Sequence, residues 1–210
     1  PLSGLHRLPT LSGRHGFIYG VSSLSALSGL ETLHLSGNYI TDISALEGLA
    51  NLRTLTVSKN DLTSFDAPTG FARMESLFLD GNAIGVLGDL SGMTRLKELR
   101  LRENAIEDIS ALAALADLQV LDLAENAIRE IESLVANPGV GTGDRIDLTG
   151  NPLGAAALCM HLPALDARGV DLTFDGTCAE GEGEGEGEGE GEGEGEGEGE
   201  GEGEGEEFCP

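Results

Sequence analysis

Apolar residues recur along the chain with a period of 22 residues. The clearest copy is Leu96–Asp117, LKELRLRENAIEDISALAALAD, with apolar side chains at positions 1, 4, 6, 11, 14, 17 and 20 and an asparagine at position 9. The same arrangement returns in windows that begin at Leu30, Leu52 and Met74. A fixed period of this length predicts a solenoid, because one unit cannot bury its apolar face and must stack on copies of itself.

Each unit divides into a strand, a turn and a return leg. Leu99 and Leu101 alternate with polar residues, which predicts a short strand whose leucines point inward. Asn104 follows where the chain turns, and its amide can both donate to and accept from backbone groups that no strand or helix pairs. In the return leg, Asp108 or Ser110 is a candidate N-cap for a short helical or 3₁₀ turn. The predicted fold class is an α/β repeat solenoid, with a curved parallel sheet on the concave side and short helices, 3₁₀ turns and loops on the convex side.

The asparagines at position 9 form a regular series along the chain. They are Asn38, Asn60, Asn82, Asn104 and Asn126, each 22 residues after the last, and Asn151, which follows after 25 residues. Their spacing predicts a ladder of backbone-satisfying turn residues. None of them begins an N-x-Ser/Thr glycosylation site.

The pattern weakens toward the ends of the array. Residues 1–7 match positions 16–22 of the unit, and residues 8–29 form a degenerate repeat. Pro68 replaces the leucine at position 17, which predicts an irregular return leg there. Residues 143–179 are expected to form a C-terminal cap, with a helix over 154–168 that Pro163 breaks or bends and a last strand at Val170–Phe174. The solenoid domain is thus expected to span residues 8–179.

Residues 180–207 have a different composition, with 15 Glu and 13 Gly. No apolar side chain is available for burial, so this run is predicted to be a disordered, extended linker. Residues 208–210 are then the start of a further segment. Without the run, the chain has 22 acidic and 12 basic residues, a net charge near −10. Such a charge argues against a nucleic-acid partner.

Two of the three cysteines lie in the predicted cap. Cys159 in the cap helix and Cys178 after the last strand could form a disulfide, as is common in oxidising compartments. The alternative is that both are simply small apolar or surface residues. If Cys159 and Cys178 are bridged, Cys209 is unpaired within this chain, and any partner would lie in a further segment.

The repeats resemble the bacterial 22-residue type of leucine-rich repeat, which is similar to the internalin repeats, and also the repeats of eukaryotic phosphatase-regulating subunits. The pattern LxxLxLxxNxIxDIxxL at 30–46 and 96–112 carries the resemblance. The NPL motif at 151–153 and the Gly-Glu run are similar to features of secreted or surface bacterial repeat proteins. The resemblance implies a binding surface on the concave face, no catalysis and no cofactor.

Side chains on the outer face of the predicted sheet are the candidate ligand contacts. An exposed aromatic beside arginines is the usual composition of an interface hot spot, which favours Phe78 with Arg100 and Arg102. The full candidate set is His34, Arg53, Thr56, Phe78, Asp80, Lys97, Arg100, Arg102 and Asp122.

These charges also have an alternative interpretation, in which they only satisfy one another across strands. Arg100 would lie between Phe78 and Asp122, Arg102 beside Asp80, and Lys97 beside Glu75.

Other chemistry finds little support. The four histidines have no Cys or carboxylate at metal-ligand spacing, and no nucleophile elbow or phosphate loop is present. The first hypothesis is a monomeric, extracellular or surface-attached bacterial module that binds a protein or glycan. The alternatives are a cytosolic regulatory scaffold, or the substrate-recognition part of an enzyme whose catalytic domain lies elsewhere. No apolar run is long enough for a membrane span.

Overall fold

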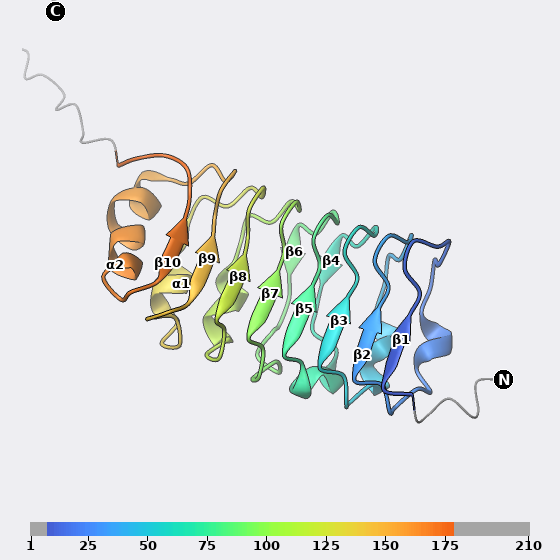
Figure 1. Cartoon of the computed structure of the whole chain (residues 1–210). Helices are drawn as coiled ribbons and strands as arrows, with labels where there is room; N and C mark the ends of the chain where they lie inside the picture. Colours follow the sequence, from blue (N-terminus) through green and yellow to red (C-terminus); the bar gives the residue numbers. More distant parts are fainter. Residues whose placement is uncertain (1–7, 179–210) are drawn as a thin grey trace, which may run out of the picture. The chain divides into compact units, whose positions relative to one another are not determined.

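The computed structural model describes residues 8–178, which form a solenoid built on one eight-stranded parallel sheet (Figure 1). Neighbouring strands pair in register, and each is three residues long. In spatial order they are β1 (Thr10–Ser12), β2 (Thr32–His34), β3 (Thr54–Thr56), β5 (Ser76–Phe78), β7 (Glu98–Arg100), β8 (Val120–Asp122), β9 (Arg145–Asp147) and β10 (Asp171–Thr173). The predicted fold class is confirmed. The predictions for 1–7, 180–207, 208–210 and Cys209 lie outside the described residues.

The core is made of rows of aliphatic side chains that run from repeat to repeat. Position 4 of each unit lies on a strand and points inward, so that Leu33, Leu55, Leu77 and Leu99 follow one another across neighbouring strands. All four are at most 1% exposed. A fully buried leucine contributes about 1.5–3 kcal/mol relative to an exposed one, so each repeat is stabilised mainly by its two neighbours.

The predicted asparagine ladder is present. The Asn60 amide nitrogen donates to the carbonyl of Val57 in its own repeat (2.8 Å) and of Leu35 in the preceding repeat (3.1 Å). Its Oδ1 accepts the N–H of Ile40 (3.0 Å). Asn126 makes the equivalent three bonds at 3.0 Å each. These residues therefore stabilise the turns and are not functional groups.

The convex side carries short helical turns, as predicted. The 3₁₀ turns are Ser22–Leu24, Ser44–Gly48, Thr69–Arg73 and Ser110–Ala114, and the α-helix α1 spans Glu132–Ala136. Of the two candidate caps, Asp108 accepts the Ser110 N–H (2.8 Å), whereas no side-chain cap bond from Ser110 is present among the described residues. The N-cap of this turn is Ile109, with non-helical φ/ψ and no side-chain cap hydrogen bond, so the prediction of Asp108 or Ser110 as the N-cap is wrong.

The return leg around Pro68 is irregular, as predicted, and contains a second sheet that the sequence did not predict. Strands β4 (Ser64–Phe65) and β6 (Val86–Leu87) pair in parallel on the side away from the main sheet (Figure 1). Pro68 lies at an extended φ/ψ directly before the 3₁₀ turn Thr69–Arg73. The repeat that follows has no helical turn on its return leg.

The cap is held by a buried amide, a continuous helical segment and a disulfide. Asn137, in the insert of the fifth repeat, is fully buried and donates to the carbonyls of Leu112 and Leu115 (2.9 and 3.0 Å). Helical residues 155–166 include a π-helical stretch, Ala157–His161, followed by α2, Leu162–Asp166. The helical segment therefore continues through Pro163. Proline has no backbone N–H to donate, and the π-helical stretch lies directly before the turn that contains it.

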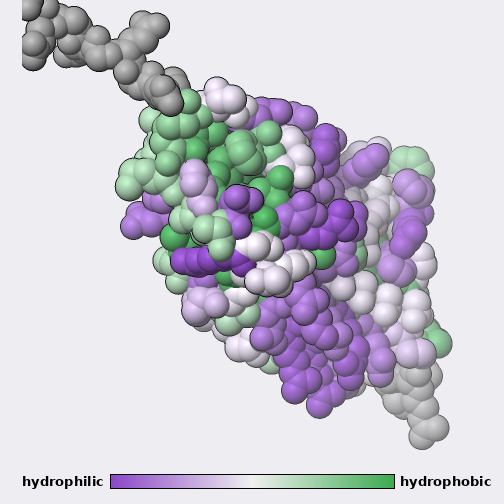
Figure 2. All heavy atoms as spheres, turned by 60° about the vertical axis from the view of Figure 1, so that its left-hand side comes forward, coloured by the Kyte–Doolittle hydropathy of each residue, from purple (hydrophilic) through white to green (hydrophobic). Residues whose placement is uncertain are grey.

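Cys159 and Cys178 form a disulfide, with Cα atoms 4.8 Å apart. It links the helical segment of the cap to the chain after β10. Hydrophobic side chains gather on this end of the array, while much of the rest of the same view is hydrophilic (Figure 2). Met160 and Phe174 are among the exposed large hydrophobic residues there.

Candidate functional site

The outer face of the main sheet carries the predicted column of position-5 side chains. Register pairs place Ser12, His34, Thr56, Phe78, Arg100, Asp122, Asp147 and Thr173 on consecutive strands. Five of the nine candidate residues lie in this column. The other four flank the strands: Arg53 and Lys97 directly precede β3 and β7, and Asp80 and Arg102 follow β5 and β7 by two residues. The structure thus places five candidates in one column on the sheet face and the other four at the ends of its strands.

Phe78 and Arg100 are in direct contact on this face. The Arg100 guanidinium carbon lies 5.3 Å from the centre of the Phe78 ring, within the range of a cation–π interaction. The same guanidinium pairs with Glu98 on its own strand (2.7 Å). Asp122 is opposite Arg100 in the register but is not its ion-pair partner. The predicted position of Arg100 beside Asp122 is therefore correct, whereas charge satisfaction by Asp122 is wrong, because the long side chain turns back to Glu98 two residues earlier.

Arg102 does not pair with Asp80, which corrects a second expected contact. It lies 3.4 Å from Glu103 and 3.5 Å from Glu125 instead. Asp80 is half-buried and accepts the Ser58 hydroxyl (3.1 Å). Burial raises the pKa of the Asp80 carboxyl, and the charge of Asp122 raises it further, against the lowering effect of the Ser58 bond. The arginine therefore finds more accessible carboxylates at the edge of the sheet.

Glu75 holds two of the candidate cations. Its carboxylate lies 2.7 Å from Arg53 and 3.7 Å from Lys97, so the expected Lys97–Glu75 pair is present. The Arg53 hydrogen bond, with a further contribution from Lys97, lowers the pKa of Glu75. All three side chains are exposed to a substantial degree, and solvent screens pairs of this kind. A ligand anion could compete with Glu75 for either cation.

His34 and Thr56 form the polar part of the column. The His34 Nδ1 lies 2.8 Å from the Thr56 hydroxyl oxygen. Burial, followed by the charge of Arg14, lowers the pKa of His34 below its ordinary value. The imidazole is therefore neutral near pH 7 and can accept or donate one hydrogen bond.

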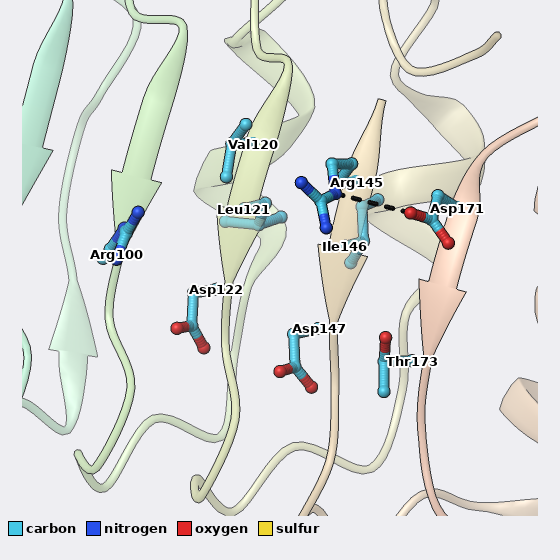
Figure 3. Close-up of a pocket in the computed structure, with 9 residues that line it drawn as sticks. All are labelled: Arg100, Val120, Leu121, Asp122, Arg145, Ile146, Asp147, Asp171 and Thr173. Carbon is cyan, nitrogen blue, oxygen red and sulfur yellow. Dashed lines mark ion pairs between the residues drawn. The ribbon is translucent and has the colours of Figure 1, made fainter. Parts of the chain in front are cut away.

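Toward the C-terminal end, the same face contains a shallow hollow of about 250 Å³ over β7 to β10 (Figure 3). Its polar lining comes from Arg100, Asp122, Arg145, Asp147, Asp171 and Thr173. Arg145 pairs with Asp171 (3.4 Å), whereas Asp122 and Asp147 lie side by side on neighbouring strands. The predicted site set did not include Arg145, Asp147, Asp171 or Thr173, because the 25-residue spacing and the cap interrupt the 22-residue alignment.

Three exposed aromatic rings form a cluster near the N-terminal end of the described chain. Tyr39 stacks between Phe17 and Tyr19, with ring centres 6.1 and 5.2 Å apart. Phe17 and Tyr19 are among the most exposed large hydrophobic residues. The sequence carried a signal for this cluster, since Phe17 and Tyr39 both occupy position 10 of successive repeats.

The described residues contain no group of three or more His, Cys, Asp or Glu side chains that could hold a metal ion. Among residues 8–178, no helix has the length and apolar character needed to cross a membrane. The arrangement of the sheet face offers contact chemistry: an aromatic ring, paired and competing charges, and a neutral imidazole.

Comparison with known families identifies the repeats. The family model described as Leucine Rich repeats (2 copies) matches residues 28–67 and 94–136. No curated protein matches the chain.

Solved structures with the same architecture include two internalins of Listeria monocytogenes. InlF is 25% identical, with 83% of this chain and 52% of InlF covered at a TM-score of 0.68. Internalin C2 is 24% identical, with 82% and 83% covered at a TM-score of 0.57, and supports the fold alone. A complex of TLR13 with ssRNA13 is 29% identical over 70% of this chain and 22% of TLR13, at a TM-score of 0.61. The chain thus spans about half the length of InlF.

Proposed function

Because the chain is a leucine-rich-repeat protein with internalin-like repeats, we propose that it is a non-enzymatic binding module that holds a protein ligand on its concave sheet face. Repeat solenoids commonly use their extended concave surface for binding. The ligand class follows from this architecture, and the contact residues follow from the side chains on the sheet.

The contact between Phe78 and Arg100 is the single observation that carries the choice of surface. Aromatic and arginine side chains are enriched among residues that dominate binding energy, especially near the centre of an interface. The strand that carries Phe78 is the fourth of eight in the sheet. Lys97 precedes β7 and Arg102 follows it, Asp80 follows β5 by two residues, and Asp122 lies opposite Arg100 on β8. A protein ligand can therefore make apolar and charged contacts at one place.

The partners of Arg100 and Arg102 do not remove them from this role. Both pairs are with exposed or half-exposed carboxylates on the same face or its edge. Exposed ion pairs contribute little net free energy, so a ligand carboxylate can replace one at small cost. We therefore assign the charged network to ligand recognition in addition to its local pairing.

The disulfide supports an extracytoplasmic location, at the surface of or outside a bacterial cell. Disulfides persist in oxidising compartments and are rare in cytosolic proteins. The bridge between Cys159 and Cys178 therefore favours this hypothesis over a cytosolic regulatory scaffold. The substrate-recognition part of a larger enzyme is a further alternative, which the complete flanking sequence would test.

Protein is preferred over nucleic acid as the ligand. The TLR13 structure contains ssRNA13, but it shares only the repeat architecture over part of its length. The part of the present chain before the Gly-Glu run contains 22 acidic and 12 basic residues. Nucleic-acid binding requires clustered Lys and Arg that neutralise phosphates, whereas the sheet face alternates both charges.

The test is capture of partner proteins by the immobilised full chain, with material from the source organism and from cells that it contacts. Arg100→Glu combined with Arg102→Glu should abolish capture of the partner that the wild-type chain retains. Arg95→Glu with Arg129→Glu is the matched control, since both residues are exposed and lie outside the sheet columns. Equal capture by the wild type and the Arg100/Arg102 variant would remove this patch from the binding surface.

A further inference from the structure

The hollow over β7 to β10 contains two carboxylates, Asp122 and Asp147, that form no ion pair with the described residues. Asp122 accepts the Ala124 N–H (3.1 Å), and Asp147 accepts the N–H and hydroxyl of Thr149 (3.0 and 2.8 Å). Neither carboxylate takes part in an ion pair within residues 8–178. They are register partners on neighbouring strands, which lie about 4.8 Å apart in a sheet.

The two arginines at the rim of this hollow are already engaged elsewhere. Arg100 lies against Phe78 and pairs with Glu98, on the side away from β9. Arg145 pairs with Asp171 on β10. In Figure 3, the dashed ion pair runs from Arg145 to Asp171, while Asp122 and Asp147 lie side by side and take no part in it. Arg102 acts on Asp122 only at longer range, because it pairs with Glu103 and Glu125, so a cation in direct contact with both aspartates would come from another molecule.

One wall of the hollow is apolar. Val120 is half-buried and occupies the position-3 column between two charged residues, Glu98 and Arg145. It lies on the same strand and the same face as Asp122. An apolar wall next to two carboxylates matches a long basic side chain, which can lay its methylene stem on Val120 and place its charged end at the aspartates.

We propose that this hollow binds an arginine side chain of the protein ligand, an inference that rests on the proposed function of the sheet face. A guanidinium is a planar group with five N–H donors that point in different directions, so it can bridge carboxylates on two adjacent strands. Lysine has a compact, strongly hydrated ammonium that suits a single point contact better. The hollow thus specifies the charge and shape of one ligand residue.

The probe is a blocked arginine, Nα-acetyl-arginine N-methylamide, added to the isotope-labelled full chain while backbone amide signals are followed by NMR. The matched probe is the citrulline analogue, which has nearly the same shape and no charge. The arginine probe should shift the amides of Val120, Asp122 and Asp147 in a saturable manner, and the citrulline probe should not. Site-resolved signals separate this binding from attraction to the Gly-Glu run.

Two double variants give the matched comparison. Asp122→Asn with Asp147→Asn keeps the acceptor oxygens for the local bonds and should weaken the arginine probe about fivefold to tenfold, as expected for two partly exposed ion pairs. Glu107→Gln with Asp117→Asn removes the same charge at exposed positions outside the sheet and should leave binding unchanged. Unchanged amide signals from the rest of the solenoid verify the fold of both variants.

Equal shifts from the arginine and citrulline probes, or undiminished affinity in the Asp122/Asp147 variant, would overturn the inference. The outcome is separable from that of the proposed function. If the probe fails here while reversal of Arg100 and Arg102 still abolishes partner capture, only the arginine assignment falls. If the probe binds but partner capture is insensitive to every sheet-face variant, the proposed function falls instead.

Discussion

Replacement of one ladder asparagine tests how the turns of the solenoid are stabilised. Asn60→Ala removes a buried amide whose Oδ1 accepts the N–H of Ile40 (3.0 Å). Ile40 is fully buried, and this N–H has no other partner in the described chain. A buried donor left without an acceptor costs about 1–3 kcal/mol.

Asn60 also makes a longer bond to the carbonyl of Ser58 (3.3 Å), which keeps the Gly37 N–H, and the carbonyls of Leu35 and Val57 keep one donor each. The carbonyl of Leu35 retains the Asn38 amide (2.7 Å), and the carbonyl of Val57 retains the Asn82 amide (3.2 Å). Their loss is therefore about 0.5–1 kcal/mol each, near the net value of an ordinary hydrogen bond. The total is a destabilisation of about 2–5 kcal/mol, which is less than three lost bonds with no remaining partners would give.

Urea unfolding of the full chain, followed by circular dichroism, measures this free energy. Asn51→Ala is the control, because Asn51 bonds to Ser28 and Arg73 at the exposed surface. It should change the free energy of unfolding by about 0.5 kcal/mol or less. If Asn60→Ala is no more destabilising than Asn51→Ala, the ladder does not stabilise the turns in the way described.

Three further changes test the cap, a buried carboxyl and the packing of neighbouring repeats. Reduction of the Cys159–Cys178 bridge, which spans 19 residues, should lower the free energy of unfolding by about 3 kcal/mol in paired denaturant curves with and without reductant; identical curves would contradict this. Burial raises the pKa of Asp80, so the folded protein favours the protonated carboxyl. The stability that this gives is fully present below the ordinary pKa of 3.8 and is lost as pH rises through the raised pKa. Asp80→Asn should therefore raise the melting temperature at about pH 7, with a gain that shrinks toward about pH 3; a gain independent of pH would refute the assignment. Gly139→Ala would place a Cβ against a backbone carbonyl of the preceding repeat and should destabilise by about 1–3 kcal/mol, whereas Gly92→Ala, with open space around it, should be nearly neutral in the same unfolding assay.

The periodic features of the fold could be predicted from the sequence. Leu33, Leu55 and Leu77 follow one another at 22-residue spacing, and stacking forces such residues onto neighbouring strands in register. The asparagine ladder follows from the same spacing. Local chemistry also predicted the irregular segment after Pro68, because proline restricts its neighbours wherever it occurs.

Features that depend on side-chain choice or on a single insertion could not be predicted. Arg100 has carboxylates within reach on its own strand and on the next, and the period does not decide between Glu98 and Asp122. Strands β4 and β6 are two residues long and have no alternating pattern. Asn137 lies in an insert without a counterpart in the other repeats, so its buried role was not apparent.

The column of side chains on the sheet face was predicted correctly, but the ion-pair partners within it were predicted only in part. The position-5 series was correct because one register governs every strand from β1 to β9. The aromatic cluster at Tyr39 was missed although Phe17 and Tyr39 share one repeat position, and the hollow beside Arg145 was missed because it lies past the 25-residue spacing. The domain boundaries and the Gly-Glu linker stay predictions.

Protection of the sheet face in a complex is the most direct test of the central claim. The captured partner and the full chain should be oxidised together by hydroxyl radicals, and side-chain modification should then be compared with that of the free chain by mass spectrometry. The binding account predicts protection of Phe78 and of its neighbours along the column, with no change at exposed residues of the convex side such as Val86. Protection of the convex side, with Phe78 as reactive as in the free chain, would contradict it.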